Sequence, residues 1–185
     1  MDIVHEAVSG GVNMVQIREK DLGVNELVKL LERLSGKIEG KAIIAVNAER
    51  YTDHFPMADA IHFPEYIQTI TPSPCKIFGR SVHSVEAARK ALQNGADYLI
   101  AGTIYESATH PERKGSGLGF LRDIVSISNK PVLGIGGIDP ARSFDVIRCG
   151  ASGVAVISAI LNSTEPATAA AKFMSNMRNA MRSQE

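Results

Sequence analysis

Three polar side chains alternate along one short apolar stretch, Val15-Gln16-Ile17-Arg18-Glu19-Lys20. On a β-strand, side chains two residues apart point to the same face, so Gln16, Arg18 and Lys20 would share one face. Buried cations need partners, and a phosphate group is a good partner for arginine and lysine. The pattern predicts a strand end that binds an anion such as pyrophosphate; a solvated strand end is the alternative interpretation.

Two further segments place glycine or serine where an apolar stretch ends. Gly136 and Gly137 let the backbone approach a ligand closely and donate its N–H groups to a phosphate. Ser158, after Ile157, can donate through both its hydroxyl and its backbone N–H. Barrels often bind phosphate between the last two strands and a short extra helix. The two segments therefore predict a phosphate site; a tight turn at the glycines and a helix cap at Ser158 are the alternatives.

A polar segment, Glu106–Gly117, separates two apolar stretches and is long for a loop of a compact domain. Such a loop suggests a lid that closes over a ligand. It contains Thr109 and His110, and hydroxyls near a cation suit a second phosphate. A mobile surface loop is the alternative interpretation.

Short apolar stretches alternate with amphipathic ones along the chain. The apolar stretches have few polar positions, as expected of parallel strands covered on both faces. Strands are expected at 13–17, 42–46, 60–63, 76–79, 98–102, 131–135 and 153–157, and helices at 3–8, 24–34, 85–94, 119–127, 141–149 and 166–182. Ser84 and Asp139 are expected N-caps, with Pro140 at a first helical position. The alternation predicts a parallel sheet, either closed as a barrel or open and doubly wound.

The number of expected strands does not match a complete barrel. A barrel of the TIM type has eight strands, whereas seven are expected here and the chain starts on a helix. Seven strands left open would expose two unpaired edges. We therefore predict an α/β fold, a TIM-type (β/α)8 barrel that lacks its first strand in this chain, unless another element covers the gap.

Composition limits the class of protein. A length of 185 residues fits a single domain over residues 1–185. The 20 basic and 20 acidic residues balance, so no overall field favours nucleic acid or a membrane surface. No apolar run approaches the roughly 18 residues of a membrane span, and no signal peptide is visible. With two cysteines that lack metal-ligand spacing, the sequence predicts a cytoplasmic protein whose partner is a small molecule.

Taken together, these segments resemble thiamine phosphate synthase and its relative, the thiazole tautomerase. The resemblance runs in chain order over almost the whole chain, through Val15–Asp21, Asn47, Gly79–Ser84, Asp97–Ile104, Gly136–Ile138 and Gly153–Ser158. In the synthase, a pyrimidine pyrophosphate ionises and the nitrogen of a thiazole phosphate captures the pyrimidine carbocation. The resemblance implies a pyrophosphate site at Arg18, Lys20, Asn47, Ser81 and Thr109, a pyrimidine contact at Gln16, and a thiazole-phosphate cradle at Gly137, Ile157 and Ser158.

The synthase binds magnesium through two aspartates, and both are missing here. Asn47 is followed by Ala48, and the segment from His62 to Ile67 contains no aspartate. Mg²⁺ binds through one or two such carboxylates, which only Glu65 or Asp53 could replace. We therefore expect no metal ligands and no cofactor, with Mg²⁺ needed only if the protein is a synthase.

The tautomerase isomerises a carboxythiazole phosphate by proton transfer and needs no metal. Its catalytic histidine would stand at Thr103, and threonine cannot act as a general base near pH 7, whereas histidine can. The lid of the synthase carries a lysine where this chain has His110. His110 or His83 could supply the missing base, although a lone histidine is often a cap or a surface residue.

Three hypotheses follow. The leading one is a metal-independent isomerase similar to thiazole tautomerase that binds a thiazole phosphate, with His110 or His83 as acid and base. The alternative is a divergent thiamine phosphate synthase, which is a transferase. The third is a non-catalytic paralogue that binds a phosphate ligand such as thiamin phosphate, because the phosphate cradle is intact while catalytic groups are absent. The resemblance also suggests a homo-oligomer.

Overall fold

The computed structural model describes residues 1–19, 21–47, 55–67, 77–106 and 114–183. The strands in these ranges are β1 (Met14–Ile17), β2 (Ile43–Asn47), β3 (Ala60–Phe63), β4 (Ile77–Val82), β5 (Tyr98–Gly102), β6 (Val132–Ile135) and β7 (Gly153–Ala155). The helices are α1 (Asp2–Ser9), α2 (Val24–Ile38), α3 (Val85–Gln93), α4 (Gly117–Ile127), α5 (Pro140–Arg148), α6 (Ser158–Leu161) and α7 (Pro166–Arg182). None of these helices is long and apolar enough to cross a membrane.

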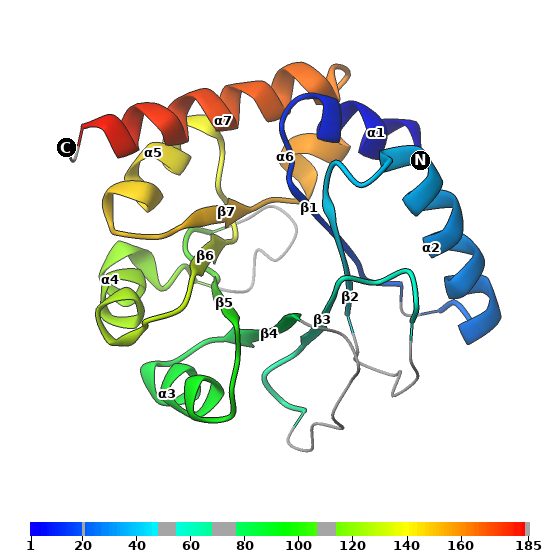
Figure 1. Ribbon diagram of the computed structural model, residues 1–185. Helices are drawn as coiled ribbons and strands as arrows, with labels where there is room; N and C mark the ends of the chain where they lie inside the picture. The colour runs from blue at the N-terminus through cyan, green and yellow to red at the C-terminus, as the bar shows by residue number, and fades with distance from the viewer. Residues whose placement is uncertain (20, 48–54, 68–76, 107–113, 184–185) are drawn as a thin grey trace.

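All seven strands are parallel, and each pairs with its neighbours in the chain, in the order β1-β2-β3-β4-β5-β6-β7. A doubly wound sheet reverses its strand order at a switch point, and this sheet does not. Figure 1 shows the strands in an arc around a common centre, with most helices outside it. The predicted α/β fold is therefore confirmed, and the parallel half-barrel sheet is consistent with a barrel similar to the TIM type. Closure into an eight-stranded ring, the missing first strand and the single domain stay predictions.

Helix α7 lies on the side of the molecule where the sheet has its two edge strands, β1 and β7. Near its start it packs on α1, since Ala7, Ala170 and Phe173 belong to one buried cluster. Further along it reaches α5, where the Asn176 side chain donates a hydrogen bond of 2.7 Å to the Pro140 carbonyl. Figure 1 shows α7 crossing from the α5 side to the α1 side of the molecule. One long helix therefore connects the two ends of the strand arc.

Two helices begin at the N-cap residues that the sequence predicts. Ser84 Oγ accepts a hydrogen bond of 3.0 Å from the Ala87 amide, and Asp139 Oδ1 accepts one of 2.8 Å from the Arg142 amide, so both predicted N-caps are confirmed. The largest differences lie at two strand ends. Strand β4 extends to Val82, three residues beyond the expected end, because its polar residues Arg80 and Ser81 continue the pairing with β5. Strand β7 ends at Ala155, two residues early.

Candidate active site

The register of the strands places polar residues in one row across the sheet. Asn47 pairs with His62, His62 with Gly79, and Gly79 with Tyr98. Residues paired across neighbouring parallel strands point to the same face, and Ser81, two residues beyond Gly79, shares that face. A sheet of mostly apolar strands therefore carries a row of polar residues that crosses it obliquely, from the last residue of β2 to the first residue of β5.

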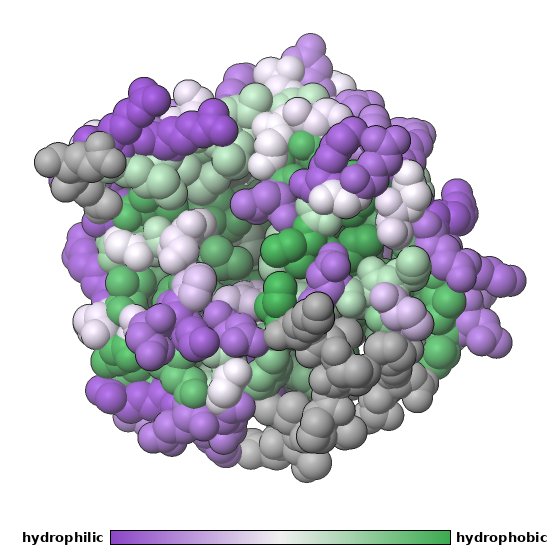
Figure 2. All heavy atoms as spheres, in the orientation of Figure 1, coloured by the Kyte–Doolittle hydropathy of each residue, from purple (hydrophilic) through white to green (hydrophobic). Residues whose placement is uncertain are grey.

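One cavity of about 1680 Å³ brings most of the predicted site residues together. Its lining includes nine of them: Gln16, Arg18, Asn47, Ser81, His83, Gly136, Gly137, Ile157 and Ser158. Lys20, Thr109 and His110 lie outside the described residues. The cavity exceeds the roughly 300–1,000 Å³ of a typical small-molecule site because it also extends between β1 and β7 to Phe173 and Met177 of α7. Figure 2 shows hydrophobic residues exposed near the centre of this view, among hydrophilic ones.

The turn between β6 and α5 forms one end of the candidate site. Gly137 has a φ of +59°, and a Cβ on it would collide with the Glu106 carbonyl and lie 2.8 Å from the Tyr105 carbonyl. Only glycine fits there without displacing the segment that follows β5. Ser158 begins the short helix α6, and Ile157 before it is 59% exposed. The predicted phosphate cradle thus consists of a turn and the start of a short extra helix, and both line the same cavity.

Arg142, which the motifs did not single out, supports this turn. Its Nη1 donates a hydrogen bond of 2.6 Å to the Gly137 carbonyl. Its guanidinium carbon lies 4.7 Å from the centre of the Tyr105 ring, a cation–π contact. Arg142 also lines the cavity. The sequence did contain a signal for Arg142. It stands in the first turn of the helix that Asp139 caps, and this places a cation close to the predicted cradle.

Gln16 of β1 and Asn47 of β2 meet in the lining of the same cavity. Asn47 is 8% exposed and its Nδ2 donates a hydrogen bond of 3.2 Å to Gln16 Oε1. Its Oδ1 is buried and has no hydrogen-bond partner among the described residues. Buried polar atoms are nearly always paired, so this oxygen marks a position where a ligand donor would fit.

His62 lies on β3, in register with Asn47 on β2, and neither composition nor spacing indicated its role. It is 1% exposed, its Nε2 is 2.8 Å from Ser81 Oγ, and its Nδ1 is 3.2 Å from the Tyr98 hydroxyl. Burial, and then the charges of Arg80 and Arg18, lower the pKa of His62 to about 3. The imidazole is therefore neutral at physiological pH and acts through its hydrogen bonds.

Acid is expected to destabilise the fold through His62. Histidine has a pKa of about 6.5 in an unfolded chain and about 3 at His62 in the folded protein. Between these values the unfolded chain binds the extra proton, so stability is lost as the pH falls. This residue should lower the free energy of unfolding by about 2 kcal/mol between about pH 7.5 and pH 5. Urea denaturation at both pH values checks this, because His62→Gln should remove that part of the loss; an unchanged pH dependence would contradict it.

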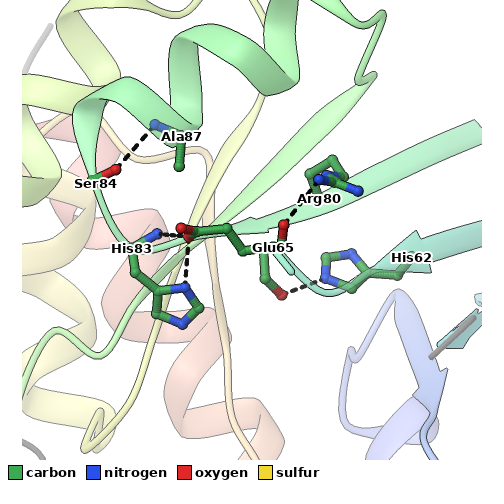
Figure 3. Close-up of polar contacts among 7 residues, drawn as sticks. His62, Glu65, Arg80, His83, Ser84 and Ala87 are labelled. Atoms are coloured by element: carbon green, nitrogen blue, oxygen red, sulfur yellow. Dashed lines mark hydrogen bonds and ion pairs between the residues drawn. The ribbon is translucent and has the colours of Figure 1, made fainter. Parts of the chain in front are cut away.

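The second histidine in the cavity lining, His83, is hydrogen-bonded to the acidic residue Glu65. Its backbone N–H donates a hydrogen bond of 2.6 Å to Glu65 Oε2, and its Nδ1 lies 2.8 Å from the same oxygen. Arg80 is buried and fixes the segment that carries Glu65, donating to the carbonyls of Ile67 (2.8 Å) and Glu65 (3.2 Å). Figure 3 shows the His83 ring beside the Glu65 carboxylate, with Arg80 on the opposite side of that residue. An imidazole held by a carboxylate is a usable acid–base group.

These residues do not fit a magnesium site. No group of three or more His, Cys, Asp or Glu side chains in the described ranges could hold a metal. Glu65, an acidic residue of the cavity lining, is hydrogen-bonded to His83. Asn47 offers one neutral oxygen, whereas Mg²⁺ is usually held through carboxylates. Asp53 lies outside the described residues.

Known proteins show the same organisation. A family profile described as "Thiamine monophosphate synthase" matches residues 1–160. The "Thiamine-phosphate synthase" of Roseiflexus castenholzii is 34% identical over 176 residues, covering 91% of this chain and 77% of that protein. The "Putative thiamine-phosphate synthase 2" of Aquifex aeolicus is 35% identical over 169 residues, covering 87% of this chain and 89% of that protein.

Among solved structures, the "Thiamine phosphate pyrophosphorylase" from Pyrococcus furiosus matches with a TM-score of 0.83 and 28% identity. The match covers 97% of this chain and 90% of that one. The 3-hexulose-6-phosphate synthase from Salmonella typhimurium, with a TM-score of 0.74 and 20% identity, shares the fold alone. Because a profile and relatives above 30% identity match over most of its length, the chain belongs to the thiamine monophosphate synthase family.

Proposed function

We propose that this protein is a transferase that makes thiamine phosphate from a pyrimidine pyrophosphate and a thiazole phosphate. The observation that carries the proposal is one cavity with two candidate anion sites. Arg18, after β1, and Ser81, on β4, form one candidate anion site in its lining, and the Gly136–Gly137 turn with Ser158, after β6 and β7, forms the second. Two phosphorylated substrates need two such sites, and a single phosphate ligand needs one. The names of the relatives support the same choice.

The reaction needs charge stabilisation more than proton transfer. The bond between the pyrimidine carbon and the pyrophosphate oxygen breaks, and its electron pair leaves with the pyrophosphate. The lone pair of the thiazole nitrogen then forms the new bond to that carbon, giving thiamine phosphate and pyrophosphate. The guanidinium of Arg18 and the hydroxyl of Ser81 would stabilise the leaving group as its charge grows. A closed site would keep water from the carbocation.

The isomerase hypothesis becomes the second candidate. No relative described above is named as a tautomerase, so the comparisons do not support that leading expectation. One observation still favours it, namely the pair of His83 and Glu65 in the cavity lining. Thr103, where the tautomerase would carry its base, also lines the cavity, and His83 would have to act in its place.

Two parallel assays test the proposal. The full chain is incubated with both synthase substrates, with and without added Mg²⁺ and chelator, and thiamine phosphate and pyrophosphate are quantified by chromatography. The expected result is formation of both products only when both substrates are present. In the second assay the carboxythiazole phosphate is supplied alone. Isomerisation that is lost in His83→Gln, without transferase activity, would replace the proposal with the isomerase. Binding of thiamin phosphate without either reaction would replace it with the non-catalytic paralogue.

A further inference from the structure

A row of three paired residues lets a tyrosine reach across one strand. His62 on β3, Gly79 on β4 and Tyr98 on β5 are in register. A Cβ on Gly79 would collide with the Tyr98 ring, so the ring passes over β4 only because that position has no side chain. The His62 and Tyr98 ring centres are 5.6 Å apart. The tyrosine hydroxyl therefore contacts a histidine two strands away.

Hydrogen bonding in this row determines where the protons lie. The Tyr98 residue is 5% exposed, and in the described part of the chain its hydroxyl has one hydrogen-bond partner, His62 Nδ1 at 3.2 Å. If Nδ1 carried the imidazole proton, it would donate to the tyrosine and leave the phenolic O–H buried without an acceptor, which is costly. If Nδ1 is unprotonated, it accepts from the phenol and every donor is satisfied. The neutral imidazole then carries its proton on Nε2.

The direction of the next hydrogen bond follows. His62 Nε2 lies 2.8 Å from Ser81 Oγ. With a proton on Nε2, the imidazole donates to Ser81 and the serine cannot donate back. The hydroxyl proton of Ser81 is then free to point into the cavity that the residue lines. A histidine beside a serine often serves as a base that takes the serine proton; here the imidazole faces the serine as a donor.

We infer that Tyr98 and His62 are positioning residues that hold Ser81 as a hydrogen-bond donor for an anionic group in the cavity. Ser81 is then an anion ligand and not a nucleophile. Identifying that anion as pyrophosphate rests on the proposed function; the proton arrangement does not. Tyr98 and His62 would affect anion affinity without touching the anion.

The tautomer can be measured directly in the unaltered chain. Nitrogen-15 NMR at neutral pH distinguishes a protonated ring nitrogen from an unprotonated one, and His62→Gln identifies the signals of His62. The expected result is a neutral ring with the proton on Nε2. A proton on Nδ1, or an equal mixture of both tautomers, would overturn the inference. This measurement requires neither a substrate nor any activity.

A double-mutant cycle tests whether Tyr98 acts through Ser81. Inorganic pyrophosphate is titrated by calorimetry into the unaltered chain, Tyr98→Phe, Ser81→Ala and the double variant. Each single change should weaken binding about tenfold, because Ser81→Ala removes the donor to a charged group and Tyr98→Phe removes the hydrogen bond that fixes the His62 tautomer and so directs that donor. The double variant should bind no more weakly than Ser81→Ala. Additive losses would mean that Tyr98 supports packing only, and would overturn the inference.

Failures of the two proposals are distinguishable. If the unaltered chain does not bind pyrophosphate, the proposed function loses its leaving-group site, while the NMR measurement still decides the tautomer. If pyrophosphate binds but the proton is on Nδ1, the inference fails and the proposed function stands. Thermal unfolding of each variant checks that the fold is retained; if Tyr98→Phe does not fold, the tautomer in the unaltered chain remains decisive.

Discussion

Replacing Arg18 with methionine is expected to lower kcat/KM for thiamine phosphate formation by about 100- to 1,000-fold, the usual effect of removing one group that stabilises developing charge. Arg18 follows β1 and lines the cavity. Its charge contributes to lowering the pKa of His62, which places it near the Ser81 network. Methionine keeps an unbranched apolar stem similar to that of arginine and removes the charge, so the loss should appear mainly in kcat.

Steady-state kinetics with each substrate varied in turn measures this effect. Arg89→Met is a matched control, because Arg89 is an exposed residue of α3 that does not line the cavity, and its activity should stay within about twofold of the unaltered chain. Arg18→Lys should lie between the two, since lysine keeps the charge but not the fork of donors. A loss below about tenfold in Arg18→Met would remove Arg18 from the leaving-group site.

Replacing Gly137 with alanine is expected to damage both stability and binding. The left-handed φ of +59° disfavours any side chain, and the new Cβ would collide with the Glu106 carbonyl. Strain and overpacking together should cost about 2–4 kcal/mol of unfolding free energy. The segment at Tyr105 and Glu106 would have to move away from the turn. KM for the thiazole phosphate should therefore rise more than KM for the pyrimidine pyrophosphate.

Urea denaturation and steady-state kinetics check this prediction together. Gly119→Ala is the matched control: Gly119 lies in α4, a Cβ there has open space, and alanine should stabilise the helix by about 0.5–1 kcal/mol. Equal stability of Gly137→Ala and the unaltered chain would show that the turn adapts freely. Equal increases in both KM values would show that the turn is not specific to the thiazole phosphate.

The sequence predicted local elements better than it predicted contacts between them. The rule that side chains alternate placed Gln16 and Arg18 on one face, and both line the cavity. The contact among His62, Ser81 and Tyr98 depends on the register of three strands and on a glycine between two of them. Register is a non-local property, so no pattern within one segment could reveal this network.

The choice between reactions illustrates a different limit. The missing aspartates after Asn47 and in the segment from His62 argued against a synthase, and two histidines argued for an isomerase. The described structure explains part of this, because Glu65 is bonded to His83 and is not a free carboxylate. The relatives are nevertheless named as synthases. Single missing ligands show which group a site has lost, but the reaction depends on the whole arrangement of charge in the cavity.

The position of α7 also has a consequence for the making of the protein. The buried cluster of Ala7, Ala170 and Phe173 joins residues from the two ends of the chain. A nascent chain therefore exposes the apolar side of α1 on the ribosome until the 17 residues of its last helix have emerged. Chains that carry exposed apolar faces and unpaired strand edges are prone to aggregate. The interval before α7 docks is thus the stage of biosynthesis at which a chaperone would have most to protect.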